Sequence, residues 1–160
     1  TDLLGGHTSS CSTSCTDCLR NYGNMGEHGL LDWRIGMSLL RVMFDALHDV
    51  CCNSTPGNLG TDMAGFEELD DWLAQATDVQ TTLCGSRVGI TARTYGDLPG
   101  VYDSARDISY VIVHPLWSVD SGPGLVIQDA IADAFVQDSP GDIRYVNTFD
   151  GMRRPSYCLR

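Results

Sequence analysis

The spacing of the hydrophobic residues predicts two helices in the first half of the chain. Between residues 30 and 50 they recur at steps of three and four, as on one face of an α-helix: Leu31, Ile35, Leu39, Val42 and Ala46. A second stripe predicts a helix over residues 65–83, formed by Phe66, Leu69, Trp72, Leu73 and Ala76. Acidic residues crowd the first turns of this helix, where they suit the helix dipole. The turn-rich residues 52–62 predict a connector between the two helices.

The second half of the chain has the hydrophobic pattern of a small sheet. Residues 87–95 alternate like a strand, and residues 108–114 (ISYVIVH) form the most strongly β-type run in the sequence. A helix is expected over residues 125–136, and a last strand over residues 143–149. Strand, helix, strand in this order predicts a βαβ unit with parallel strands and a right-handed crossover.

Residues 1–28 lack this periodicity and carry candidate metal chemistry. Three cysteines follow the pattern Cys11-x3-Cys15-x2-Cys18, and a two-residue spacer lets a tight turn aim two thiolates at one zinc ion. Structural zinc takes four ligands. We expect His7, four residues before Cys11, to be the fourth. His28 and a cysteine preceding residue 1 remain alternatives.

The number and spacing of the cysteines favour a zinc site over disulfide bonds. The count of seven is odd, and three lie within eight residues, which indicates a reducing compartment rather than a disulfide framework. A redox Cys15–Cys18 pair is the alternative, but a redox CxxC opens a helix after a strand, and no strand precedes this one. The expected fold is therefore α/β: a zinc knuckle and long helix in residues 1–50, then a helix and small sheet in residues 51–160, packed as one compact domain.

The charge of the chain limits its partners. The formal net charge is −11, with 21 acidic residues against 10 basic ones, all of which are arginine. Such a surface repels phosphate backbones on average, so any contact with nucleic acid must be local or supplied by another part of the assembly. The basic doublet Arg153–Arg154 is the candidate for a phosphate or partner contact.

Signals for catalysis are weak. Because the chain has no lysine, it cannot contain the phosphate-binding loop GxxxxGK[ST]. His114 ends the strongest predicted strand, where α/β sheets place ligands, although we expect it to pack beside Trp117. A nuclease site would also need carboxylates, for which Asp103, Asp107 and Asp120 are candidates only by abundance.

The segment 11–34 resembles a known zinc-binding domain. That domain lies at the C-terminus of certain superfamily-two DNA helicases and in the helicase-accessory subunit of the DISARM phage-defence system. The resemblance rests on Ser14-Cys15, Asp17-Cys18-Leu19, Tyr22, Asn24, His28, Leu31-Asp32 and Trp33-Arg34. It covers about 25 residues. The four-cysteine form of the family has one more nearby cysteine than this chain. From the residues alone, we expect Asn24 to take a left-handed turn, and Tyr22 and Trp33 to pack the knuckle onto the following helix.

The resemblance implies a non-catalytic zinc-bearing accessory domain in DNA processing or phage defence. Its partner would be an ATP-dependent helicase motor, and the domain would contact DNA through the assembly that it forms with this motor. Two alternatives stay open: a divergent nuclease-like α/β domain with a site near His114, and a protein–protein docking module. No run of eighteen apolar residues suggests a membrane span, and we expect a cytoplasmic protein.

Overall fold

The structure, a computed structural model, describes two separate parts of the chain. The described residues are 14–16, 19–33, 35–36, 39, 43, 68–117, 119 and 123–160. The chain divides into two compact units, Thr1–His48 and Asp49–Arg160. Of the expected zinc ligands, His7, Cys11 and Cys18 lie outside the described residues.

The first unit contains a short 3₁₀ helix, η1 (Tyr22–Glu27). Two asparagines form its N-terminal capping box: Asn24 N donates to Asn21 Oδ1 at 3.1 Å, and Asn21 N donates to Asn24 Oδ1 at 2.8 Å. This reciprocal pair satisfies two backbone amides at the helix start. Beyond it, the described positions Trp33, Ile35, Gly36, Leu39 and Met43 are helical, in agreement with the predicted helix over residues 30–50.

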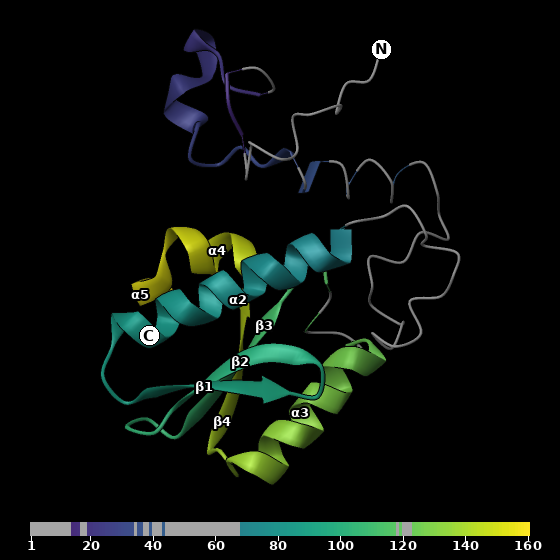
Figure 1. Cartoon of the computed structure of the whole chain (residues 1–160), viewed down its shortest axis with the longest axis vertical. Helices are drawn as coiled ribbons and strands as arrows, with labels where there is room; N and C mark the ends of the chain where they lie inside the picture. The colour runs from purple at the N-terminus through teal and green to yellow at the C-terminus, as the bar shows by residue number, and fades with distance from the viewer. Residues whose placement is uncertain are drawn as a thin grey trace. The chain divides into compact units, whose positions relative to one another are not determined.

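The second unit is a four-stranded mixed sheet covered by helices (Figure 1). The strands lie in the order β1-β2-β3-β4; the first two pairings are antiparallel and the third is parallel. Helix α2 lies over one face with α4 and α5, and α3 lies over the other. The bounds are α2 Glu68–Ser86, β1 Ile90–Tyr95, β2 Leu98–Asp103, β3 Ile108–Val113, α3 Leu125–Gln137, β4 Asp142–Asn147, α4 Thr148–Arg153 and α5 Pro155–Cys158.

The α/β class and the parallel βαβ unit β3-α3-β4 are confirmed. All six residues of β3 are buried, because this strand lies inside the sheet and is covered on both faces. Helix α2 adds Trp72, Ala76, Val79 and Leu83 to the same core. Among the described residues, no helix is both long enough and apolar enough to cross a membrane.

Strand β2 was not predicted from the sequence. It contains Pro99 and Gly100, which are both unfavourable in strands. The structure gives a reason for the glycine: a Cβ at residue 100 would lie 2.5 Å from Tyr95 Cδ2 and 2.7 Å from the Tyr110 carbonyl oxygen. The close approach of the Tyr95 ring therefore requires glycine there.

Candidate functional site

The segment around Cys15 forms a tight turn in the first unit. The Cys15 carbonyl accepts hydrogen bonds from Leu19 N at 3.2 Å and Arg20 N at 2.9 Å. Arg20 Nε donates to the buried Ser14 Oγ at 2.9 Å, which fixes the two ends of the turn together. The turn begins at Cys15, the one cysteine of the Cys11-x3-Cys15-x2-Cys18 pattern that lies within the described residues.

His28 lies at the end of η1 with one ring nitrogen already engaged. Its Nε2 lies 3.0 Å from the Asn21 carbonyl oxygen and 2.9 Å from Asn24 Oδ1. The Asn24 amide orientation is fixed because its Nδ2 donates to the Leu19 carbonyl at 2.8 Å. Both neighbours of Nε2 are acceptors, so Nε2 carries the proton and Nδ1 is the basic nitrogen. Metal-ligating histidines are held in this way, with the second nitrogen donating to an oxygen.

Two expectations for this segment are wrong. Asn24 has φ −112° and ψ 23°, so it does not adopt the left-handed conformation; it acts through its side chain in the capping box. Tyr22 is 90% exposed, so it does not pack the knuckle onto the helix. Among the described residues, no group of three or more candidate metal ligands comes together. The zinc site with Cys11, Cys15, Cys18 and His7 therefore stays a prediction.

His114 is packed among aromatic rings, as expected. Its ring centroid lies 6.1 Å from that of Trp117 and 6.3 Å from that of Trp72, and the two indoles lie 4.8 Å apart. The Leu116 backbone N–H donates to His114 Nδ1 at 3.2 Å. Burial lowers the pKa of His114 from 6.5 to about 4, so the imidazole is neutral at physiological pH.

This depressed pKa predicts an acid sensitivity. The unfolded chain binds a proton at His114 below about pH 6.5, whereas the folded chain binds it only near pH 4. The stability that this difference contributes is present above pH 6.5 and is lost as the pH falls towards 4, by at most about 3 kcal/mol. We expect His114→Phe to remove the part of the stability loss between pH 6.5 and 4 that comes from His114. Urea unfolding of both proteins at several pH values measures it, and parallel stability curves for the two proteins would contradict the assignment.

The candidate carboxylates lie away from His114. Asp103 is fully buried at the β2–β3 turn, where its carboxylate accepts from Arg87 Nη1 at 3.1 Å and from the Ala105 N–H at 3.0 Å. Asp107, at the same turn, accepts from Tyr102 Oη at 2.8 Å and Gly141 N at 3.0 Å.

His114 follows the other end of β3. Six strand residues separate Asp107 from His114, a distance of about 20 Å along an extended chain. The two aspartates stabilise turns and do not converge on the histidine. Asp120 lies outside the described residues.

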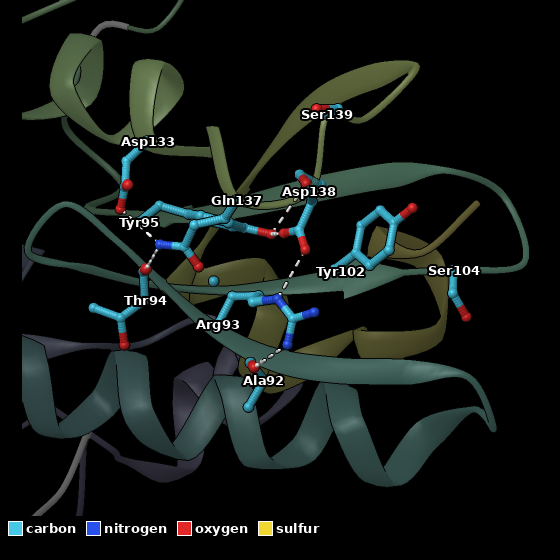
Figure 2. A network of polar contacts seen from close by, with 12 residues as sticks. Ala92, Arg93, Thr94, Tyr95, Tyr102, Ser104, Asp133, Gln137, Asp138 and Ser139 are labelled. Atoms are coloured by element: carbon cyan, nitrogen blue, oxygen red, sulfur yellow. Dashed lines mark hydrogen bonds and ion pairs between the residues drawn. The ribbon is translucent and has the colours of Figure 1, made fainter. Parts of the chain in front are cut away.

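A second polar cluster joins α3 to the sheet (Figure 2). Asp138, at the C-terminal end of α3, accepts from Tyr95 Oη at 2.6 Å and from Arg93 Nε at 2.9 Å. The Tyr95 hydroxyl also lies 3.0 Å from Ser109 Oγ. Burial, and then the hydrogen bond to Asp138, raise the pKa of Tyr95 well above its ordinary value of 10. This cluster, which we call the Asp138 network, buries the Asp138 carboxylate while Arg93 stays partly exposed, and it serves packing.

The arginine doublet divides between two environments. The Arg153 guanidinium lies 3.7 Å from the centroid of the Phe149 ring, and its Nη1 donates to the Phe149 carbonyl at 3.2 Å. Arg154 is exposed. Arg154 is therefore more accessible to a phosphate or partner than Arg153, which is already engaged with its own helix.

Comparisons of the chain with protein-family models, with curated proteins and with solved structures find no match.

Proposed function

We propose that the chain is a zinc-bearing, non-catalytic accessory module of an assembly built around a DNA helicase. The observation that carries the proposal is the arrangement between Cys15 and His28. The turn at Cys15 and the orientation of His28 by Asn21 and Asn24 support a knuckle closed by zinc. Cys15, Asn24 and His28 also belong to the residues that carry the resemblance to the helicase-associated zinc domain.

The zinc would be structural. Cys11, Cys15 and Cys18 would supply three thiolates, and His7 or His28 the fourth ligand. Such an ion stabilises a small segment that has few apolar side chains of its own. No step of a reaction is assigned to it.

The second unit supports an accessory role. The described side chains that a nuclease could use are engaged in packing or turns: His114 packs beside the rings of Trp72 and Trp117, and Asp103 and Asp107 hold the turn before β3. We propose a cytoplasmic location and a role in DNA processing or phage defence.

Purification of the tagged chain from its native host tests the proposal. We expect it to bring down an ATPase whose activity is stimulated by DNA, and His114→Phe to leave both the association and the ATPase rate unchanged. The isolated chain should not cleave DNA in the presence of Mg²⁺ or Mn²⁺. Metal-dependent cleavage by the pure chain that is lost in a folded His114→Phe variant would instead establish the nuclease.

A further inference from the structure

The C-terminal segment is locally basic within an acidic chain. Residues 142–160 contain four of the ten arginines but only two acidic residues, whereas the whole chain carries a net charge of −11. This segment comprises β4, α4 and α5. Arg106 adds a further guanidinium, because its Nη1 donates to the Leu159 carbonyl. The repulsion of phosphate expected from the net charge of the whole chain therefore does not apply to this segment.

A pocket of about 420 Å³ lies within this segment. Its volume is in the range of sites for small organic molecules. It is lined by β4, α4, α5 and the end of the chain, through Arg144, Tyr145, Val146, Asn147, Asp150, Tyr157, Cys158 and Arg160. We call it the β4 pocket.

The two arginines of the β4 pocket remain accessible. The side chain of Arg144 is 44% exposed and pairs at 2.9 Å with Asp142, which is itself 52% exposed. An exposed pair of this kind contributes little free energy. Arg144 Nη1 also donates to the Arg160 carbonyl oxygen, so a phosphate reaches the guanidinium by replacing Asp142 at Nε. Arg160 is exposed, with its guanidinium 5.1 Å from the centroid of the Tyr157 ring.

The β4 pocket also contains a carboxylate, a thiol and an aromatic ring. The carboxylate of Asp150 accepts a hydrogen bond from Asn147 Nδ2 at 2.8 Å. Burial raises the pKa of the Cys158 thiol, which keeps this side chain neutral. Tyr157 is 61% exposed and offers an aromatic ring beside the two cations.

We infer that the β4 pocket binds one nucleotide unit of a single-stranded nucleic acid, with Arg144 and Arg160 at the phosphate and Tyr157 stacked on the base. Exposed aromatic rings beside cationic side chains are the recurring means of holding single strands. A paired base is not free to stack on a side chain, which favours a single strand over a duplex. The inference rests on the proposed function and gives the module its own contact with the strand.

Titration of the isotope-labelled full chain with a thymidine hexanucleotide, followed by NMR, tests this inference. We expect weak binding, with dissociation constants above about 10⁻⁴ M, and chemical-shift changes centred on Asn147, Tyr157 and Cys158. Tyr157→Ala should weaken binding about fivefold or more, whereas Tyr157→Phe should retain it. Arg144→Gln should weaken binding and reduce the salt slope by about 0.7.

A control variant separates the effect of losing a local phosphate contact from the effect of a more negative net charge. Ala132→Glu, at an exposed position of α3 on the opposite side of the sheet, changes the net charge by the same amount as Arg144→Gln and should have little effect. Equal weakening by both variants would overturn the inference, as would the absence of shifts at the β4 pocket at millimolar hexanucleotide.

Two further ligands distinguish the source of the nucleotide. Thymidine monophosphate should shift the same resonances at higher concentration than the hexanucleotide, and a duplex should shift them least. Tighter binding of the free nucleotide would overturn the assignment to a strand. Tyr157→Ala should leave the zinc content unchanged, so failure of this inference and failure of the zinc proposal give different results.

Discussion

Replacing Cys15 by serine is expected to release the zinc ion and unfold the knuckle. A serine hydroxyl cannot replace a thiolate ligand, and structural zinc contributes on the order of 10 kcal/mol to the folding of small segments. Elemental analysis of the purified variant should give less than half a zinc ion per chain. NMR resonances of Asn24 and His28 should lose their dispersion, because their contacts with Asn21 and Leu19 depend on the folded turn.

The matched control is Cys84→Ser in α2. Cys84 is partly buried against the core of the second unit, and burial raises the pKa of its thiol, so it is expected to stay protonated and bind no metal. This variant should keep its zinc. Full zinc occupancy in Cys15→Ser, or equal loss in both variants, would contradict the assignment of the ion to the knuckle.

Asp138→Ala is expected to have the largest effect on the second unit. The side chain of Asp138 is only 4% exposed and pairs with Arg93, which is 32% exposed. Its removal takes the ion pair from Arg93 and a short hydrogen bond from Tyr95 Oη. We expect a loss of about 2–3 kcal/mol, below the value for a fully buried pair because Arg93 can be hydrated. For a unit of this size, that lowers Tm by roughly 10 °C.

Calorimetry of the variant beside Asp129→Ala measures this effect. Asp129 lies on the exposed side of the same helix, so its replacement changes the charge and helix propensity without breaking the Asp138 network. Its Tm should remain within a few degrees of the wild type. A similar decrease in both variants would mean that the Asp138 network does not stabilise the unit as described.

Much of the fold could be predicted because it depends on local periodicity. The strongly β-type run of β3, the stripe of α2 and the strand–helix–strand order are all visible in the sequence, and the structure confirms these elements. Helices α4 and α5 have only six and four residues, too few to form a periodic pattern. Strand β2 was missed because Pro99 and Gly100 argue against a strand, and the need for Gly100 arises from the Tyr95 ring.

The sites were less predictable because they join distant residues. Tyr95 and Asp138 are 43 positions apart, and nothing in either neighbourhood indicates their contact. The local excess of arginines in the sequence indicated a basic region near the β4 pocket. The prediction chose the doublet Arg153–Arg154, whereas the arginines that line the pocket are Arg144 and Arg160. The capping pair of Asn21 and Asn24 was visible in principle, as two side chains three residues apart that can each accept from the other's backbone.

The fourth zinc ligand can be identified by two substitutions. The Nδ1 atom of His28 is suited to a metal because Nε2 already donates to Asn21 and Asn24, whereas His7 lies outside the described residues. Loss of tight zinc binding in His28→Gln but not in His7→Gln would assign His28. The reverse result would assign His7, and retention in both would point to a cysteine from another part of the protein.

X-ray absorption at the zinc edge of the purified full chain tests the central claim most directly. We predict one zinc ion per chain, with three sulfur atoms at about 2.3 Å and one nitrogen atom at about 2.0 Å. A fourth sulfur would keep the structural site and replace histidine as the ligand. A chain without tightly bound zinc, or zinc bound by oxygen and nitrogen alone, would contradict the proposed knuckle.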